Sequence, residues 1–213
     1  LGASFPQRRI KDGKEVVSDK KYVVYLLRAS SAPNQYHGWL CGGAIINKDY
    51  VITSAACVQD VRHIYVVPGY KNYVSADKID DDPCVKEKKK KVVLTCVPRN
   101  YQFEYNRTEV WAKIDIAVIK VESSFDFNDK SYETICSYTP QAIDFNTEKE
   151  FPKPGDDVIV LGWGHTKEFR KDKDLVDLNQ ATLHYAPTRV LEEEICVKYF
   201  NGNKELASFI ASS

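Results

Sequence analysis

The fold is decided by the stretch Cys41-Gly42-Gly43-Ala44-Ile45-Ile46, followed closely by Tyr50-Val51-Ile52-Thr53-Ser54-Ala55-Ala56-Cys57. It combines a glycine pair with a short aliphatic run. Runs of this kind, rich in β-branched and aromatic residues and separated by Gly, Pro, Asn and Asp, recur at residues 22–27, 44–46, 64–67, 92–95, 116–121, 158–161 and 181–185. This recurrence predicts an all-β protein.

Two segments depart from the strand pattern. Thr188 can cap a turn beginning at Arg189, and apolar residues follow at helical spacing, which predicts a short helix near residues 188–200. The polar stretch 122–153 contains turn formers and few strand signals. It is typical of a connection between two sheets, with a boundary near residues 122–135.

Composition excludes several classes of function. The 213 residues contain 30 Lys plus Arg and 30 Asp plus Glu, so no net charge attracts nucleic acid or an anionic membrane. No apolar run approaches the roughly 20 residues of a membrane helix. The 6 Cys form no CxxC pair, which favours disulfides over a metal site. With no Met and no apolar leader, we expect a secreted, processed protein without a cofactor.

The chain resembles chymotrypsin-like serine proteases. The opening stretch matches that family's CGGSLI and WVLTAAHC, residues 115–121 match DIALIKL, and Gly162-Trp163-Gly164 matches GWG, in the family's order from Ile10 to about Ile210. The resemblance implies two packed six-stranded antiparallel β-barrels of the chymotrypsin type. Residues 1–122 would form an N-terminal segment and the first barrel, and residues 123–213 a linker and the second barrel.

The resemblance also implies a degenerate catalytic site. Ala56 stands where the family has its catalytic His, and Asp115 stands where the family's Asp orients that imidazole. A methyl group cannot take the nucleophile's proton or return it to the leaving amine, so we expect no functional catalytic residue here. Without an imidazole, Asp115 needs other donors or water, or its pKa rises. We expect all four histidines, at positions 37, 63, 165 and 184, to be ordinary surface or core residues.

Both ends of the chain differ from an active protease. The family's GDSGGP would begin near Ser213, so the nucleophile is not visible; we expect a C-terminal segment to be missing and the second barrel to be incomplete. Ile10-Lys11-Asp12-Gly13 stands where the family has IVGG. Seating Lys11 and Asp12 in an apolar pocket would cost on the order of several kcal/mol, which predicts a zymogen-like activation region.

The cysteines and a glycosylation sequon suggest modifications. The family resemblance implies a Cys41–Cys57 disulfide. We expect a local hairpin bridge between Cys84 and Cys96, which leaves Cys136 and Cys196 to pair with each other or beyond Ser213. The sequon Asn106-Arg107-Thr108 offers a possible glycosylation site.

A charged segment flanks Cys84, with acidic residues at 77–82 and five lysines within 86–91. One interpretation is a patch for heparin or nucleic acid. The other, which we favour, is the solvated edge of a hairpin that faces its own acidic partner.

In detail the chain is similar to group three mite allergens, and among them to the scabies mite inactivated serine protease paralogues. That resemblance implies a secreted, non-cleaving protein that binds host proteins and inhibits host complement. The alternatives are a residual hydrolase with a non-standard general base and a polyanion-binding protein. We expect no nucleic-acid or membrane partner, and the oligomeric state stays open.

Overall fold

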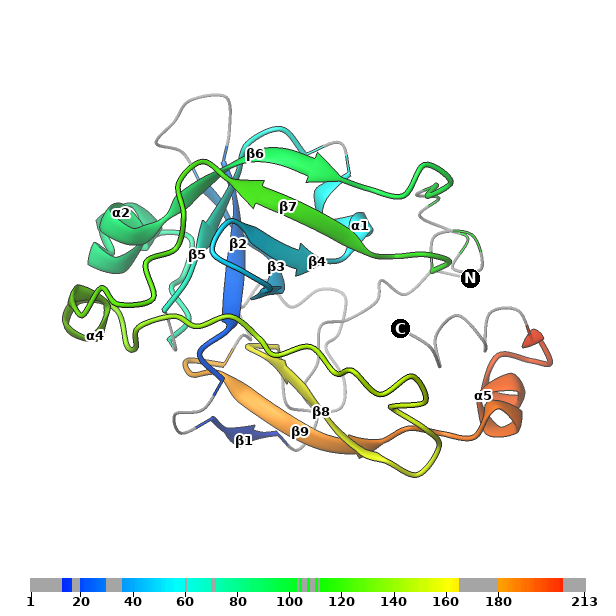
Figure 1. The fold of residues 1–213 in the computed structure, drawn as a ribbon. Coiled ribbons are helices and arrows are strands. Elements are labelled where there is room, and N and C mark those ends of the chain that lie inside the picture. The colour runs from blue at the N-terminus through cyan, green and yellow to red at the C-terminus, as the bar shows by residue number, and fades with distance from the viewer. Residues whose placement is uncertain are drawn as a thin grey trace.

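The computed structural model describes residues 13–16, 20–29, 36–59, 61–69, 72–102, 104, 107, 110, 112–164 and 180–204. Its largest unit is a closed antiparallel barrel (Figure 1). Around the barrel, in the order in which they pair, lie β2 (Val23–Ala29), β3 (Tyr36–Ile45), β4 (Tyr50–Thr53), β7 (Ala117–Val121), β6 (Lys90–Cys96) and β5 (Ile64–Val67). The predicted six-stranded first barrel is therefore confirmed.

Strand β2 is buried on both faces because it joins two cores. Val24 and Leu26 belong to the cluster inside the barrel. Tyr25 and Leu27 alternate with them and pack in a second cluster that includes Trp163 of the predicted Gly-Trp-Gly motif. The rings of Tyr25 and Trp163 meet edge to face with centroids 5.9 Å apart. Because side chains alternate along a strand, β2 contributes residues to the barrel core on one face and to the cluster around Trp163 on the other.

The second glycine of the opening stretch is required by close strand packing. A Cβ atom on Gly43 would lie 2.9 Å from the Ile52 carbonyl oxygen and 2.9 Å from Val51 Cγ1 on the neighbouring strand β4. Its predecessor is different, because a Cβ on Gly42 would have no atom nearer than the Val24 carbonyl oxygen at 3.8 Å. The glycine requirement is therefore steric and specific to Gly43.

A second, smaller sheet lies below the barrel in Figure 1. It consists of β1 (Lys14–Glu15), β9 (His184–Arg189) and β8 (Asp157–Gly162), paired in that order and antiparallel. Within the described residues the predicted second barrel is represented by these three strands. The helix predicted at 188–200 begins later, as α5 (Glu193–Tyr199), because Thr188 continues β9 and pairs with Val158.

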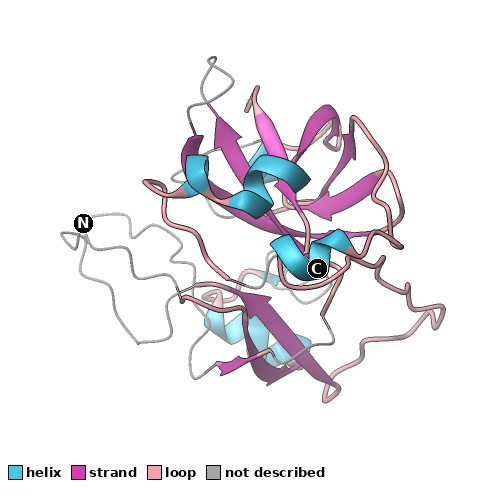
Figure 2. Cartoon of the chain, turned by 90° about the vertical axis from the view of Figure 1, so that its left-hand side faces the viewer, coloured by secondary structure: helices cyan, strands magenta, loops and turns pink. Residues whose placement is uncertain are grey.

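The described residues also contain the short helical segments α1 (Ala55–Val58), η1 (Ile79–Asp81), α2 (Pro83–Lys88) and α4 (Ser131–Ile135). The predicted hairpin around Cys84 is wrong, because η1 and α2 occupy that region. The Asp82 side chain accepts a hydrogen bond from the Val85 N–H at 2.9 Å and Pro83 is the first helical residue, which together start α2. Figure 2 faces this side of the molecule and shows short helices in front of the barrel strands.

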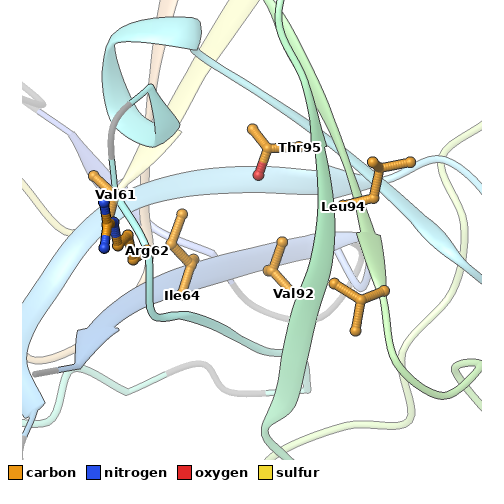
Figure 3. Close-up of a pocket in the computed structure, with 7 residues that line it drawn as sticks. Val61, Arg62, Ile64, Val92, Leu94 and Thr95 are labelled. Carbon is orange, nitrogen blue, oxygen red and sulfur yellow. The ribbon is translucent and has the colours of Figure 1, made fainter. Parts of the chain in front are cut away.

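The pairing between β5 and β6 is short, as it is between β3 and β4. Only Tyr65 with Lys91 and Val66 with Lys90 are paired between β5 and β6. Beyond these pairs a half-open cavity of about 120 Å³ lies between the strands (Figure 3). In the described part of the chain, no helix has the length and apolar composition that crossing a bilayer needs.

Candidate functional site

Neighbouring strand ends bring the two predicted triad positions together. Strand β4 pairs with β7, with Thr53 opposite Ala117. Ser54 and Ala56 follow β4 at the start of α1, while Asp115 lies just before β7. Residues far apart in the sequence therefore meet at one edge of the barrel, as the family resemblance predicts.

The carboxylate of Asp115 is fully engaged by neighbours other than an imidazole. Ser54 Oγ donates to Asp115 Oδ1 at 2.7 Å and lies 2.8 Å from Oδ2. The backbone N–H of Ala56 donates to Oδ1 at 2.8 Å. Ala56 N–H is one of the donors that the first turn of a helix leaves without an intrahelical acceptor. Asp115 thus caps α1 from the turn before β7, and of the alternatives given above for this carboxylate the structure shows other donors.

The backbone before Asp115 is strained. Ile114 has φ 58°, a left-handed conformation that is unfavourable for a β-branched residue. The Ile116 N–H donates to the Ile114 carbonyl at 2.8 Å and closes a tight turn around Asp115. Such strain persists where surrounding contacts hold it, and it is concentrated at functional sites. The turn fixes the carboxylate above α1.

A buried tyrosine borders the carboxylate. Tyr101 is 4% exposed and belongs to the barrel core. Burial raises the pKa of its hydroxyl above the usual value, and the negative charge of Asp115 acts in the same direction. The hydroxyl approaches Asp115 without meeting hydrogen-bond geometry with any described residue. Tyr101 therefore stays protonated and is no general base at neutral pH.

The methyl group of Ala56 packs against the barrel core. The predicted disulfide between Cys41 and Cys57 is present and ties α1 to β3. Around Asp115, the described residues that make polar contacts with the carboxylate are a hydroxyl and an amide donor, and neither accepts a proton from a nucleophile. The arrangement is that of a structural cap.

The described histidines His63 and His184 are not among the residues that contact Asp115. His184 is in β9, where its Nδ1 lies 2.8 Å from the Thr182 carbonyl oxygen, a local contact. His63 precedes β5. His165, Asn106 and the segment Ile10-Lys11-Asp12 lie outside the described residues. What the sequence predicts for them stays a prediction.

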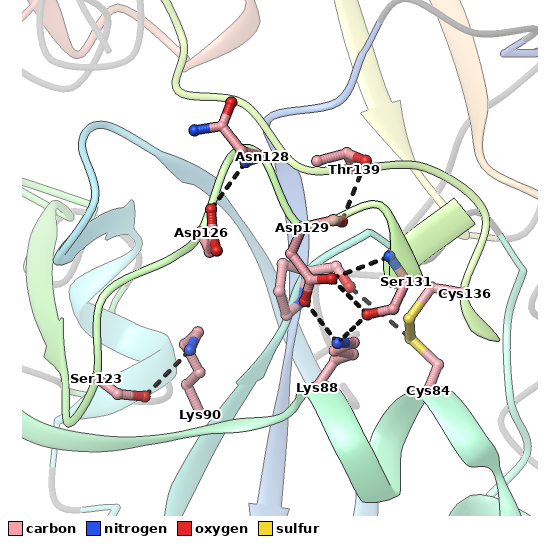
Figure 4. A network of polar contacts seen from close by, with 11 residues as sticks. Cys84, Lys88, Lys90, Ser123, Asp126, Asn128, Asp129, Ser131, Cys136 and Thr139 are labelled. Carbon is pink, nitrogen blue, oxygen red and sulfur yellow. Dashed lines mark hydrogen bonds and ion pairs between the residues drawn. A yellow bond between two sulfur atoms is a disulfide. The ribbon is translucent and has the colours of Figure 1, made fainter. Parts of the chain in front are cut away.

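Only part of the lysine-rich segment lies on a helix. Lys88 ends α2 and faces an acidic partner, in line with the favoured interpretation, whereas Lys90 and Lys91 begin β6 (Figure 4). Lys88 Nζ lies 2.7 Å from Asp129 Oδ2 and 2.6 Å from Ser131 Oγ, and it sits over the Tyr132 ring. The Lys88 hydrogen bond is the main cause that lowers the pKa of Asp129 to about 2, with Ser131 adding to the effect. This network joins α2 to α4.

The cysteine pairing differs from the prediction. Cys84 bonds to Cys136 and not to Cys96 (Figure 4). Cys84 is buried on α2 next to the end of α4, whereas β6 carries Cys96 away toward its partner Val118 on β7. Cys96 is free and exposed, and Cys196 is free and buried on α5. The proposed pairing of Cys136 with Cys196 is therefore also wrong.

Sequence reasoning missed the role of Ser54. The Ser in place of the family's Ala was visible, but its contact with Asp115 spans 61 residues of sequence. The signal that could have found it is that Ser54 and Ala56, two departures from the family pattern, lie two residues apart in the motif that contacts the family's Asp. Among the described residues, no group of three or more His, Cys, Asp or Glu could hold a metal ion.

Comparison with known proteins decides the family, because the model of the trypsin family matches residues 11–210. The chain belongs to the trypsin family. Venom serine protease 34 of Apis mellifera is 30% identical over 131 residues, covering 61% of this chain and 29% of that protein. Chymotrypsin of Phaedon cochleariae is 25% identical over 180 residues, covering 84% of this chain and 56% of that protein. The chain thus spans well under two thirds of these trypsin-family relatives.

Solved structures of this family show the same fold. Mouse neuropsin, a serine protease, matches with a TM-score of 0.64 and 18% identity, covering 91% of this chain and 70% of that one. A scabies mite inactivated protease paralogue matches with a TM-score of 0.63 and 21% identity, covering 93% of this chain and 70% of that one. The chymotrypsin-like architecture is therefore established for this trypsin-family chain.

Proposed function

We propose that this chain is a catalytically inactive, secreted trypsin-family protein that acts by binding host proteins, complement components among them. One observation carries the proposal: the carboxylate of Asp115 is occupied by Ser54 Oγ and the Ala56 N–H, and position 56 offers a methyl group. Proton transfer in this family needs an imidazole that takes and returns a proton, and neither contact supplies one.

Binding without turnover suits this scaffold. The closed barrel and the second core around Trp163 make a rigid body, on which loops can present a stable recognition surface. A scabies mite inactivated protease paralogue has a similar fold, and this likeness supports a protein that binds without cleaving. The two disulfides suit an oxidising, extracellular compartment.

The polyanion-binding alternative is weakened by the network on α2. Lys88 is 14% exposed on its side chain and is paired with Asp129, and Lys86 is paired with Asp81 at 3.4 Å. Charges that are already neutralised within the fold release few counterions from a polyanion. The alternative of a residual hydrolase is tested directly below.

The deciding experiment uses the full-length secreted protein. It is incubated with a broad peptide-substrate library and with a serine-reactive phosphonate probe, beside an active trypsin-family protease as the positive control. We expect no hydrolysis above the no-protein control. Turnover of any peptide together with labelling by the probe would reject an inactive protein.

The binding half of the proposal has its own test. The immobilised protein is exposed to serum and the captured proteins are identified, and complement-dependent lysis of sensitised erythrocytes is measured with and without the soluble protein. We expect capture of complement components and reduced lysis. Unchanged lysis at saturating protein would contradict complement inhibition and leave the catalytic question separate.

A further inference from the structure

At the seam between β5 and β6, part of β6 has no partner strand among the described residues, although the barrel is otherwise closed. Along β6 the pairing with β5 stops after Lys90 and Lys91, while pairing with β7 continues as far as Cys96 opposite Val118. Among the described strands, none pairs with the β5-facing edge of residues 92–96. An edge of this kind offers backbone donors and acceptors to another extended chain.

A bulge shapes this edge. The register between β6 and β7 shifts between Val92 and Leu94. As a consequence Val93 and Leu94 are exposed, by 55% and 49%, although a barrel strand normally alternates buried and exposed residues. Figure 3 shows Val92 and Thr95 on the side of β6 that faces Ile64 and Val61.

The cavity at this seam has the size of one side chain. Its volume is about 120 Å³, and it is lined by Val61, Arg62, Ile64, Val92, Val93, Leu94 and Thr95. Pockets for small molecules typically have about 300 Å³ or more, so the cavity suits an aliphatic side chain better than a free metabolite. Its floor includes Ile64, which is 2% exposed and belongs to the barrel core.

The positive charge of Arg62 at the rim of the cavity favours a ligand that carries a negative charge. Arg62 is the charged residue of the lining, it is exposed, and the described residues offer it no ion pair. A carboxylate beside the aliphatic anchor would complement it. In an extended chain, adjacent side chains point to opposite faces, so one residue can enter the cavity while its neighbour reaches the outer rim.

A second copy of this chain fits the seam poorly. The edge that a second copy would insert is β6 itself, whose sequence Lys90-Lys91-Val92-Val93-Leu94-Thr95-Cys96 contains two lysines and no carboxylate. Pairing of two such edges would bring lysines toward Arg62, and like charges disfavour association. The observations therefore favour a different partner that carries acidic residues.

We propose that the seam between β5 and β6 binds an extended, acidic peptide segment of a partner protein by strand addition to β6. An aliphatic side chain of that segment fills the cavity over Ile64 and Val92, and an adjacent carboxylate pairs with Arg62. This inference deepens the proposed binding function by naming a surface. It does not depend on the absence of hydrolysis, so its failure leaves the site around Asp115 to be judged by its own test.

The test uses the full-length protein and a fluorescent peptide, acetyl-Thr-Val-Glu-Leu-Thr-Val-amide, with binding followed by fluorescence anisotropy. Two matched peptides replace Glu by Lys or carry N-methyl groups on alternate amides, which removes strand hydrogen bonds. We expect saturable binding of the Glu peptide, and each change should weaken binding by about tenfold or more, as for the loss of a charge-assisted or backbone contact.

Two protein variants make the site specific. Arg62→Glu should weaken binding of the Glu peptide by about tenfold and restore binding of the Lys peptide, because the charges are exchanged. Lys91→Glu makes the same change of net charge on an exposed β6 residue outside the lining and should leave both affinities within about twofold. Circular dichroism confirms that both variants are folded.

Three results would overturn the inference. They are equal weakening by Arg62→Glu and Lys91→Glu, undiminished binding of the N-methylated peptide, and the absence of saturable binding of the Glu peptide up to about 1 mM. A positive result includes slowed amide hydrogen exchange at residues 93–95 when the peptide is bound, because strand addition protects these groups from solvent.

Discussion

Ser54 Oγ lies 2.7 Å and 2.8 Å from the two carboxylate oxygens of Asp115, in the place where the family resemblance implies an imidazole. The contact joins a residue at the start of α1 to the turn before β7. It turns an acid that orients a catalytic base in active relatives into part of the scaffold. Ser54 and Ala56, two positions at which this chain departs from the family pattern, therefore both contact the same carboxylate.

The hydroxyl of Ser54 should stabilise the fold. Ser54→Ala is expected to lower the free energy of unfolding by about 1–2 kcal/mol, because a hydrogen bond to a half-buried carboxylate is lost. Urea denaturation measures the change. The matched control is Ser124→Ala, which removes an exposed Ser hydroxyl that donates to Asp49 and should cost less than about 0.5 kcal/mol. Equal effects would show that Ser54 has no special role.

An imidazole introduced by Ala56→His should compete with Ser54 for Asp115. We expect its pKa to be higher by about one unit when Ser54→Ala is added, because a free carboxylate stabilises the imidazolium directly. Titration by NMR measures both values. Adding Asp115→Asn should abolish the difference. If Ser54→Ala leaves the pKa of the introduced imidazole unchanged, the Ser54 hydroxyl does not compete for the Asp115 carboxylate.

Ala56→His alone should not produce a protease. Lys11 and Asp12 stand where the family has apolar activation residues, and their charges oppose burial in an apolar pocket. Measurable peptide hydrolysis by the full-length single variant would contradict this expectation.

The Lys88–Asp129 pair should stabilise the protein in a defined pH range. The pKa of Asp129 is lowered from 3.8 to about 2, so the folded state favours the ionised carboxylate. The contribution is fully present above about pH 4 and is lost as the pH falls through about 2. Asp129→Asn should lower the melting temperature at pH 7 and should approach the parent protein near pH 2.

The control for this prediction is Asp81→Asn. Asp81 pairs with Lys86 at 3.4 Å, but both side chains are largely exposed, so the melting temperature should hardly change. A difference between Asp129→Asn and the parent that is independent of pH would show that the ionised pair is not the cause.

The two disulfides should contribute unequally to stability. Cys84 and Cys136 are separated by 52 residues, whereas Cys41 and Cys57 are separated by 16. By loop-closure entropy, removal of the longer bridge should cost about 4 kcal/mol and removal of the shorter one about 3 kcal/mol. Paired Cys→Ser variants in denaturant test this order.

Thiol labelling tests the pairing itself. In the native protein Cys96 should react with a maleimide, and Cys196 should react only after unfolding, because the first is exposed and the second is buried. Mass spectrometry of a non-reduced digest should recover the peptides of Cys84 and Cys136 cross-linked. A cross-link between Cys84 and Cys96 would reject the arrangement of α2 and β6.

The two glycines of the opening stretch should differ sharply. Gly43→Ala places a methyl group against the Ile52 carbonyl and should cost about 2–3 kcal/mol, as overpacking does. Gly42→Ala would make only an ordinary van der Waals contact with the Val24 carbonyl oxygen and should change stability by less than about 1 kcal/mol. Urea denaturation of both variants makes the comparison, and equal losses would contradict the close approach of β3 and β4.

Much of the barrel was predictable from local patterns. The predicted runs overlap strands β2, β5, β6, β7 and β8, because β-branched residues favour extended backbone. The predicted start of the last helix was less accurate. Thr188 could cap a helix, but its pairing with Val158 on β8 keeps it in strand β9. The positions of Ala56 and Asp115 followed from motif order alone.

By itself the sequence determined where most strands lie and where the motif residues Ala56 and Asp115 stand, because runs of β-branched residues and motif spacing are properties of short segments. Only the tertiary structure decided that Ser54 donates to the Asp115 carboxylate, that Cys84 pairs with Cys136, and that no described strand pairs with the β5-facing edge of residues 92–96. These contacts join residues 61 and 52 positions apart, or depend on where pairing stops. Packing of the whole chain determines these partners, and the local sequence around each residue does not predict them.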